Sequence, residues 1–274
     1  MKVQVLGSAA AEGVPGYFCE CPICIEAREN KGKNLRRRTS YLLDDDTLLD
    51  CGPDFARQRD EFHIQTLKLK RILFSHSHKD HLDIYPFLIR QKRYSVVHTP
   101  ITVIADSAPL ERIRKETGCT FDEMFLHAKQ ISPGNIIQDD DLTVFAVRAA
   151  HPAETTPLNY FITRNNKTVL FQNDSGWWAD DTWKMAADYG VKADLVILEC
   201  TTAFGRPDFD AHHLGVNATV RFRDKLLECG IIRKDTICVA NHFSHHGDPR
   251  HDRLEDFFIP RNIIPAYDGM ILDL

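Results

Sequence analysis

The 274-residue chain is long enough for one large α/β domain or two small ones, and would bury about three quarters of its unfolded surface. Its apolar content of 43%, charged content of 27% and net charge of −5 give no hint of a nucleic-acid surface. Because no apolar run approaches the roughly 20 residues that cross a bilayer, and the apolar stretch at the N-terminus is too short for a signal peptide, we expect a cytoplasmic protein without a membrane segment.

Short apolar runs that predict strands outnumber the runs that predict helices. Strands are expected at Val3–Leu6, Ser40–Leu43, Leu48–Asp50, Ile72–Phe74, Ile101–Ile104, Thr143–Val147, Tyr160–Thr163, Val169–Phe171, Leu195–Leu198 and Ile237–Ala240. Helices are expected at Ile84–Lys92, Pro109–Glu116, Asp180–Tyr189 and Val216–Cys229. This alternation favours an α+β fold, the αββα sandwich, with two mixed sheets packed face to face and helices outside. We expect a single domain over residues 1–274, and Asp268-Gly269 predicts a C-terminal hairpin turn.

The first motif along the chain is a cysteine cluster in a Gly/Pro-rich loop at about residues 13–30, with Cys19, Cys21 and Cys24 at C-x-C-x-x-C spacing. Three thiolates this close can hold one tetrahedral Zn²⁺ if a fourth ligand arrives from elsewhere. A redox C-x-x-C motif is the competing interpretation, but the third cysteine and the lack of a thioredoxin-like βαβ context count against it. The other five cysteines are scattered, and we expect them to be reduced thiols.

The second motif is His76-Ser77-His78-Lys79-Asp80-His81, which follows the apolar strand predicted at Ile72–Phe74. Three imidazoles and a carboxylate therefore lie where a strand ends and a loop begins, a common position for catalytic groups. They could coordinate one divalent cation or divide between two, and this ligand chemistry suits Zn, Mn, Fe or Ni better than Mg or Ca. A histidine-rich surface loop is the plain alternative.

His-x-His-x-Asp-His is the signature of the metallo-β-lactamase superfamily, and the chain resembles that family. Residues 7–15 and the three cysteines resemble its PhnP-like phosphodiesterase branch. The resemblance implies a dinuclear site in which His76 and His78 bind one metal, and Asp80 and His81 bind the other. Three later ligands, each after its own predicted strand, would complete the site: His151, the bridging Asp174 and His242.

The resemblance also implies two further histidine roles. His245, three residues after His242, would be the fourth ligand of the structural zinc, although the adjacent His246 competes for this assignment. His213, four residues before Asn217, matches a catalytic histidine outside the metal shell. The plainer interpretation is that His213, or its neighbour His212, caps the following helix.

The function implied by the resemblance is hydrolysis of a small phosphodiester, which could be a cyclic ribose or nucleotide phosphodiester. A hydroxide bridging two divalent metals would attack phosphorus, and His213 would stabilise a phosphoryl oxygen or protonate the leaving group. Asp80 would contribute to the reaction by binding one of the two metals. Mn or Zn is expected in this site, Ni or Fe is possible, and one structural Zn is expected in the cysteine loop. The family also suggests a homodimer, whereas a nucleic-acid partner is not expected.

Several alternatives stay open at this point. A PqqB-like protein of cofactor biosynthesis would share the cysteine loop, and a lactonase or esterase could use the same dinuclear centre. A tRNA 3′-processing nuclease would bring a basic arm, which this sequence does not show. A metal-dependent sensor or scaffold without turnover is the non-enzymatic alternative.

Four further features carry weaker expectations. Asp50 falls in a turn that in the family supports the metal loop, and Glu199 falls where the family often has an acidic residue near the site. Residues 36–38 form a run of three arginines, which predicts a solvated loop or, alternatively, a phosphate contact. Trp177 or Trp178 could stack on a substrate, with core packing as the alternative.

Overall fold

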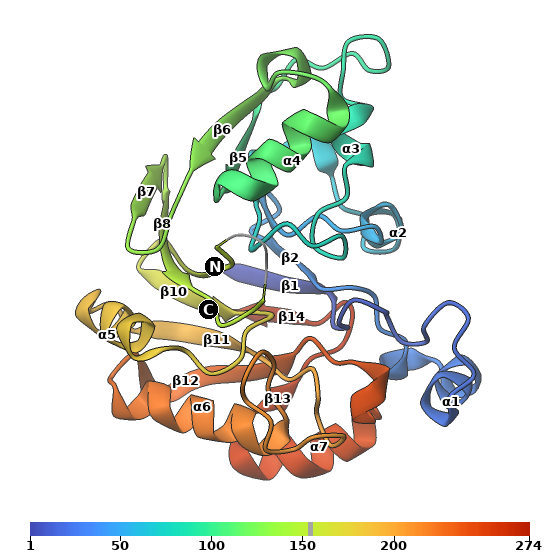
Figure 1. Cartoon of the computed structure of the whole chain (residues 1–274), viewed down its shortest axis with the longest axis vertical. Helices are drawn as coiled ribbons and strands as arrows, with labels where there is room; N and C mark the ends of the chain where they lie inside the picture. Colours follow the sequence, from blue (N-terminus) through green and yellow to red (C-terminus); the bar gives the residue numbers. More distant parts are fainter. Residues whose placement is uncertain (153–155) are drawn as a thin grey trace.

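The computed structural model describes residues 1–152 and 156–274, and its strands form two seven-stranded sheets (Figure 1). The first sheet has the order β14 (Ile271–Asp273), β1 (Lys2–Gly7), β2 (Ser40–Leu43), β3 (Thr47–Leu49), β4 (Arg71–Leu73), β5 (Ile101–Ala105) and β6 (Leu126–Gln130). The second has the order β13 (Ile264–Pro265), β12 (Ile232–Asn241), β11 (Ala193–Glu199), β10 (Lys167–Gln172), β9 (Leu158–Arg164), β8 (Leu142–Arg148) and β7 (Ile136–Asp139). Each sheet mixes parallel and antiparallel pairs, as predicted.

The two sheets pack face to face, and helices cover their outer faces. A buried cluster joins Val5 and Leu73 of the first sheet to Tyr160 and Val239 of the second. Outside the first sheet lie α2 (Phe55–Glu61), α3 (Tyr85–Leu88) and α4 (Ser107–Thr117). Outside the second lie α5 (Asp180–Asp188), α6 (Val216–Glu228) and α7 (His251–Phe258), as Figure 1 shows. The predicted αββα sandwich is confirmed.

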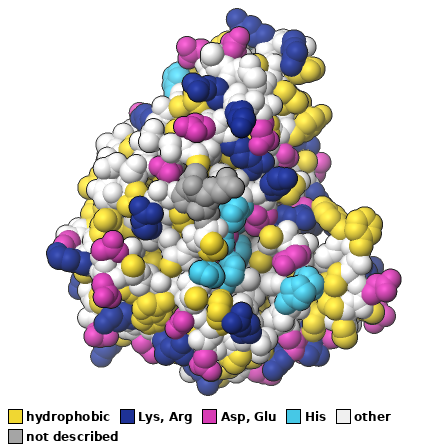
Figure 2. Space-filling model, in the orientation of Figure 1, with side chains coloured by type: hydrophobic (Ala, Val, Ile, Leu, Met, Phe, Trp, Pro, Cys, Tyr) yellow, Lys and Arg dark blue, Asp and Glu magenta, His cyan; other side chains and the backbone are white. Residues whose placement is uncertain are grey.

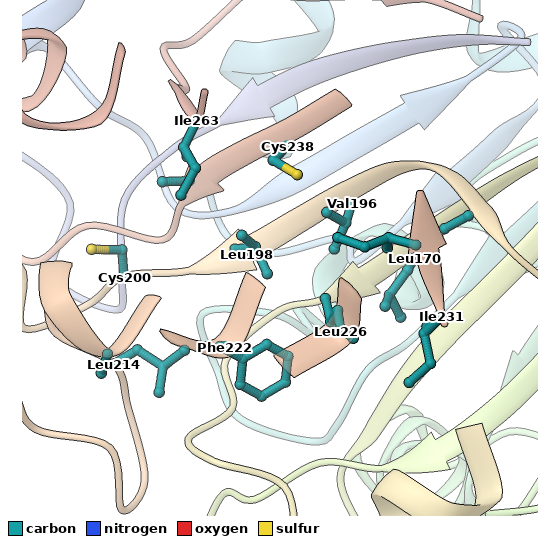
Figure 3. Packing of buried hydrophobic residues seen from close by; sticks show 14 of the residues in the cluster. Leu170, Val196, Leu198, Cys200, Leu214, Phe222, Leu226, Ile231, Cys238 and Ile263 are labelled. Atoms are coloured by element: carbon teal, nitrogen blue, oxygen red, sulfur yellow. The ribbon is translucent and has the colours of Figure 1, made fainter. Parts of the chain in front are cut away.

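The packing of α6 shows how a helix holds the second sheet. Phe222 and Leu226 stand four residues apart, on the same face of the helix, and both are completely buried. They share one hydrophobic cluster with Leu170 of β10 and Leu198 of β11 (Figure 3). Burying a side chain of this size stabilises the fold by about 1.5–3 kcal/mol. This cluster therefore fixes the strands whose ends carry the candidate site.

Several local predictions differ from the structure. The predicted helix Ile84–Lys92 is only the four residues of α3, because the chain then turns and Arg90 donates hydrogen bonds to carbonyls near β6. The helix α1 (Pro22–Asn30), within the cysteine loop, and α7 were not predicted. Short 3₁₀ turns lie at Gly32–Asn34, Thr66–Lys68, Asp122–Met124, His245–Gly247 and Ile259–Arg261.

The predicted C-terminal hairpin is wrong. Asp268 and Gly269 do form a turn, and Gly269 has a φ of +90°, which glycine adopts readily. However, the strand before the turn, β13, belongs to the second sheet, and the strand after it, β14, belongs to the first. The turn is therefore a crossing between the two sheets. No helix in the described part of the chain has both the length and the apolar character needed to cross a membrane.

Candidate metal centre

The loop that carries the histidine motif is held by Asp50, which follows β3. One carboxylate oxygen of Asp50 accepts a hydrogen bond from the backbone N–H of Ser75 at 2.8 Å, and the other lies 2.7 Å from His81 Nδ1. Because a carboxylate can only accept, His81 Nδ1 donates to Asp50, and Nε2 is the ring nitrogen that faces the other ligands. Asp50 is completely buried, which agrees with the expectation that it supports the loop.

The structure brings the first expected set of ligands together at the edge where the two sheets meet. His76, His78, His151 and Asp174 each have a ligand atom within 4.8 Å of the others. His78 Nδ1 lies 3.2 Å from His151 Nε2, and His76 Nε2 lies 3.3 Å from one oxygen of Asp174. The four side chains come from segments that follow β4, β8 and β10, so both sheets contribute.

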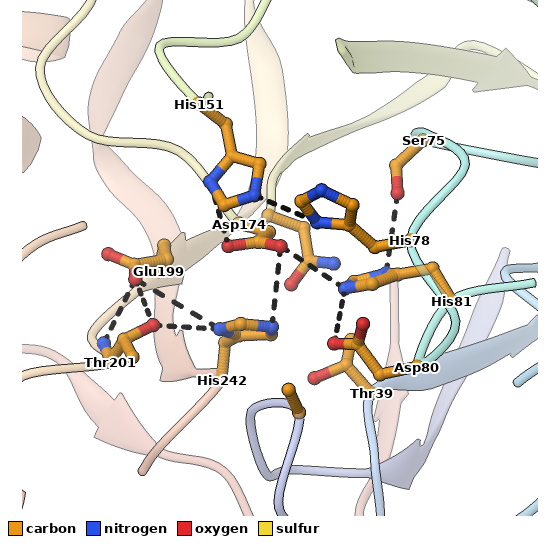
Figure 4. Close-up of polar contacts among 12 residues, drawn as sticks. Thr39, Ser75, His78, Asp80, His81, His151, Asp174, Glu199, Thr201 and His242 are labelled. Carbon is orange, nitrogen blue, oxygen red and sulfur yellow. Dashed lines mark hydrogen bonds and ion pairs between the residues drawn. The ribbon is translucent and has the colours of Figure 1, made fainter. Parts of the chain in front are cut away.

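The second set shares Asp174 with the first and adds Asp80, His81 and His242 (Figure 4). His81 Nε2 lies 3.2 Å from an Asp80 oxygen and 3.3 Å from an Asp174 oxygen, while His242 Nε2 lies 3.9 Å from that same Asp174 oxygen. Asp174 therefore stands between the two sets, where it could bridge two cations.

The donor atoms of both sets fit divalent cations. Within the described residues, five buried atoms of this cluster have no hydrogen-bond partner: His76 Nε2, His81 Nε2, His151 Nδ1, His242 Nε2 and Asp174 Oδ1. Buried polar atoms without a partner are rare, because each costs about 1–3 kcal/mol. Nitrogen lone pairs and carboxylate oxygens that converge at 3.2–3.9 Å would repel one another unless a proton or a cation lay between them. Imidazole and carboxylate ligands suit Zn and Mn.

The electrostatic environment favours the metal-binding protonation states of several ligands. Burial lowers the pKa of His151 to about 3 and that of His242 to about 4, so both rings are neutral at physiological pH. Burial alone would raise the pKa of Asp80, but the adjacent His81 outweighs it and holds that pKa well below its usual value. Asp174 is likewise ionised, because the nearby histidines, His242 foremost, outweigh the effect of burial and lower its pKa.

His81 is the exception among these ligands. Burial alone would lower its pKa, but Asp80, Asp50 and Asp174 raise it well above the usual value. Its Nε2 would therefore release a proton when a cation binds.

Three site residues have a left-handed backbone that side chains rarely adopt. Asp50, Asp174 and His242 have φ values of 60°, 47° and 63°, and each follows a strand end. Such conformations cost about 1–3 kcal/mol each and persist only where the surroundings enforce them. The strained backbone at these three residues therefore turns their side chains toward the cluster.

A buried network of Glu199, Thr201 and His213 lies beside the metal ligands. The Thr201 hydroxyl contacts a Glu199 oxygen and lies 2.8 Å from His242 Nδ1. Because the carboxylate can only accept, the hydroxyl donates to Glu199 and accepts from His242 Nδ1–H, which leaves the lone pair on His242 Nε2. The same Glu199 oxygen lies 2.9 Å from His213 Nδ1.

His213 is positioned differently from the ligands. Its Nδ1 is tied to Glu199 and lies 3.3 Å from Asp174, while the side chain remains 28% exposed. Burial alone would lower its pKa, but the adjacent carboxylates of Asp174 and Glu199 raise the pKa to about 10. Glu199 also accepts from the backbone N–H of Leu214, so its oxygens are occupied by protein donors and it is a poor candidate for a metal ligand.

The cysteine cluster forms a separate site. Cys19, Cys21, Cys24 and His245 have ligand atoms within 4.8 Å of one another. His245 Nδ1 lies 3.7 Å from the Cys19 sulfur and 3.5 Å from the Cys21 sulfur. Zn–S bonds of about 2.3 Å and Zn–N bonds of about 2.0 Å at tetrahedral angles give edges of about 3.6 Å, so the spacing suits zinc. The competing His246 is exposed and groups instead with Glu12 and His245.

The residues proposed as ligands thus lie together in the two groups around Asp174 and in the cysteine cluster, and the structure decides two weaker expectations. Trp178 is buried and donates a hydrogen bond to Asn159, and Trp177 packs on the same core, so neither is placed to stack on a substrate. The arginines at 36–38 do not form the expected solvated loop, because all three side chains are largely buried. Arg36 is completely buried and bonds Ser8, Ala266 and Pro249.

Sequence reasoning missed the role of Thr201. The hydroxyl lies two residues after Glu199, and only the fold brings it to His242, forty-one positions along the chain. A threonine after an acidic strand end carries no signal of its own. Ser75, whose hydroxyl bonds both Asp50 oxygens, was missed for the same reason.

The chain matches a known protein family and several known proteins. A model of the "Beta-lactamase superfamily domain" matches residues 46–228. An octanoyltransferase of Porphyromonas gingivalis is 30% identical over 161 residues, 55% of this chain and 31% of that protein, so the match spans less than a third of the relative.

Among solved structures, a diphosphatase from the PhnP family has a TM-score of 0.75 and 20% identity, covering 100% of this chain and 97% of the other. Zn²⁺-bound PqqB from Methylobacterium extorquens has a TM-score of 0.73 and 19% identity, with 100% of both chains covered. At these identities the two structures show that the fold is shared.

Proposed function

Because the chain belongs to the beta-lactamase superfamily, we propose that it is a dinuclear metal-dependent hydrolase acting as a phosphodiesterase on small phosphodiesters. The observation that carries the proposal is the convergence of unpaired imidazole nitrogens on both sides of Asp174. A site of this kind with an ionisable His213 at its open edge is suited to hydrolysis, whereas a purely structural metal site is normally closed.

We assign the ligands from the geometry of the two groups. His76, His78 and His151 would hold one cation, Asp80, His81 and His242 the other, and Asp174 would bridge them. When bound, two divalent cations lower the pKa of water and neutralise charge that develops on a phosphoryl group. The neutral state of His151 and His242 leaves their lone pairs available for this role.

The chain's own residues would supply the proton for the leaving group and would orient His213 and His242. His213 is protonated at neutral pH, because its pKa is raised to about 10 by Asp174 and Glu199 against the effect of burial. A protonated imidazole at the open edge could donate to the leaving alkoxide of a phosphodiester or to a phosphoryl oxygen. Glu199 would hold its Nδ1–H, and Thr201 would orient His242 through the same carboxylate.

The test is a comparison of three substrates with protein reconstituted in Mn, Zn or Ni: bis(p-nitrophenyl) phosphate, p-nitrophenyl phosphate and a lactone. The proposal predicts turnover of the diester and none of the other two. His78→Ala should abolish this turnover, while the metal-free variant should melt close to the metal-free wild type. Turnover of the lactone alone would indicate that the enzyme attacks a carbonyl carbon and not phosphorus. If none of the three substrates is hydrolysed, the PqqB-like or non-catalytic alternative would be favoured.

A further inference from the structure

The loop at residues 76–82, which carries four of the candidate ligands, has few backbone hydrogen bonds of its own. It belongs to no helix or strand of the structure. The His78 carbonyl accepts from the backbone N–H groups of His81 and Leu82. The carbonyls of Ser77 and Leu82, in contrast, have no backbone donor among the described residues. Because backbone carbonyls away from water are normally paired, the loop needs a donor from another part of the chain.

Arg112 of α4 is that donor. Its Nη1 donates to the Ser77 carbonyl at 2.7 Å and to the Leu82 carbonyl at 3.2 Å. No other side chain in the described part of the chain donates to either carbonyl. Ser77 lies between two ligands of the first group, and Leu82 directly follows a ligand of the second. One guanidinium therefore contacts the backbone beside both groups.

The Arg112 side chain is itself held in position. Its Nε donates to a Glu116 oxygen at 2.8 Å, one turn further along α4, and the side chain is only 18% exposed. The same helix buries Leu110 and Ile113 in one hydrophobic cluster with the Leu82 side chain. The helix and the loop are thus packed together, and the guanidinium has a fixed place between them.

Two charged side chains of opposite sign therefore fix this loop. Asp50 accepts hydrogen bonds from the Ser75 N–H and from His81 Nδ1, whereas Arg112 donates to two carbonyls. Hydrogen bonds to charged groups are roughly twice as strong as bonds between neutral groups. If the guanidinium were removed, the ligands on both sides of Ser77 and the ligand before Leu82 would lose a fixed backbone.

We propose that Arg112 is a positioning residue of the metal centre, which holds the Ser77 and Leu82 carbonyls and thereby keeps the ligands of both groups in place. The inference rests on the metal centre of the function proposed above. Arg112 acts through the backbone of the loop and contacts no ligand side chain among the described residues. Residues that orient metal ligands typically change metal affinity by about 10–100-fold when removed.

The test is a titration of the full-length protein with Mn²⁺, in which electron paramagnetic resonance measures the free ion. Mn²⁺ suits imidazole and carboxylate ligands better than the thiolates of the cysteine cluster. The histidines can be reached from solution, because His78 and His213 are partly exposed and Figure 2 shows a row of histidine side chains on the surface near the middle of the molecule.

We expect Arg112→Ala to bind Mn²⁺ at least about tenfold more weakly than the wild type, because the loop loses its donor. Arg112→Lys keeps a cation that can reach one of the two carbonyls, so its affinity should lie between those of the alanine variant and the wild type. Arg114→Ala is the matched control, since Arg114 lies on the same helix, is exposed and makes no side-chain hydrogen bond or ion pair within the described residues. It should bind Mn²⁺ as the wild type does.

Chemical rescue separates positioning from a general effect on folding. Guanidinium chloride at about 20 mM, far below denaturing concentrations, should restore part of the Mn²⁺ affinity of Arg112→Ala and leave Arg114→Ala unchanged. A variant that was merely less stable would gain nothing from the added cation. Equal Mn²⁺ affinity in Arg112→Ala and Arg114→Ala, or a loss that guanidinium does not repair, would overturn the proposal.

The titration uses no substrate, so its outcome is independent of the reaction. If Mn²⁺ binding depends on Arg112 but no diester is hydrolysed, the proposed phosphodiesterase function fails and the positioning role stands. If the diester is hydrolysed and Arg112→Ala binds Mn²⁺ as tightly as the wild type, the positioning role fails and the function stands. If both hold, the Mn²⁺ concentration that gives half-maximal hydrolysis should rise in Arg112→Ala by the same factor as the dissociation constant.

Discussion

At the scale of single residues, one carboxylate organises both the proposed proton donor and a metal ligand. Glu199 is completely buried, and burial raises its pKa, which the hydrogen bond from His213 opposes. It holds His213 directly and His242 through the Thr201 hydroxyl. Outer residues of this kind typically change metal affinity or activity by 10–100-fold when removed.

Thr201→Val tests this relay, because it keeps the shape of the side chain and removes the hydroxyl. His242 Nδ1–H and Glu199 would each lose a partner, so we expect kcat/KM on bis(p-nitrophenyl) phosphate to fall about 10–100-fold. Thr202→Val is the matched control, since among the described residues the Thr202 hydroxyl bonds only the Arg206 carbonyl. Wild-type kinetics in Thr201→Val would show that the relay has no functional role.

His213→Gln tests proton donation. General acid catalysis contributes about 10²–10⁴-fold, and the loss should depend on the leaving group. The reduction in kcat should be small for a p-nitrophenolate leaving group, which needs little protonation, and large for an alkoxide. A loss of the same size for both would instead assign His213 to contact with the phosphoryl oxygens.

At the scale of elements, the cysteine loop and the 3₁₀ turn His245–Gly247 are tied by the candidate zinc site. Cys21 caps α1 through its sulfur, which accepts a hydrogen bond from the Cys24 N–H. The site therefore joins the start of a helix near the N-terminus to the segment that follows His242. A metal here would hold that segment in place and act on the reaction only through position.

The adjacent histidines give a sharp test of this site. His245→Ala should lose one equivalent of zinc and melt several degrees lower, because a structural zinc contributes directly to folding. His246→Ala should keep both the zinc and the melting temperature, and Cys21→Ser should behave like His245→Ala. Loss of zinc from His246→Ala but not from His245→Ala would reverse our assignment. In His245→Ala and Cys21→Ser, hydrolytic activity should fall only to the extent that the stability of the fold is reduced.

The contact of α7 with the segment before β2 should make stability depend on pH. His251 Nδ1 lies 3.2 Å from Arg36, and burial together with that guanidinium lowers the pKa of His251 to about 4. The ring is therefore neutral in the folded protein and gains a proton more readily when unfolded. Its contribution to stability is fully present above pH 6.5 and is lost as pH falls from 6.5 through 4.

Urea denaturation across this pH range measures the effect. The midpoint should fall more steeply toward low pH in the wild type than in His251→Gln, which can still accept from Arg36 but cannot titrate. His98→Gln, at an exposed position, should follow the wild-type curve. Parallel curves for the wild type and His251→Gln would contradict the assignment of this pH dependence.

At the scale of the whole molecule, the candidate metal ligands come from both sheets. His76 to His81 follow β4 of the first sheet, whereas Asp174 and His242 follow β10 and β12 of the second. Cations bound between them would connect the two halves of the sandwich. Binding to the folded state alone stabilises it by mass action.

Loading the metal-free protein with Zn or Mn should therefore raise the melting temperature in a concentration-dependent way. Asp174→Asn should remove most of this increase, because it weakens both ligand groups at once. Asp194→Asn is a suitable control, since Asp194 lies at the opposite end of β11 from Glu199 and pairs with Arg233 and Lys167. An unchanged increase in Asp174→Asn would contradict the assignment of a shared ligand.

How much the sequence could predict depends on how local each signal is. The histidine motif lies within six residues and predicted a metal loop from chemistry alone, whereas Asp174 and His242 were found only through the family resemblance. The hairpin prediction failed because the turn at Asp268 is encoded locally, while the choice of sheet on either side depends on long-range pairing. Thr201 and Ser75 were not predicted because their neighbours are set by the tertiary fold.

The most direct test of the account is the number of metal ions per chain, measured by native mass spectrometry after loading with Zn. We predict three ions in the wild type, two in His245→Ala, and one in a variant that combines His78→Ala with Asp174→Asn. A wild-type chain that retains one ion, lost on His245→Ala, would mean that the histidine cluster is not a dinuclear site. That result would contradict the proposed hydrolase mechanism.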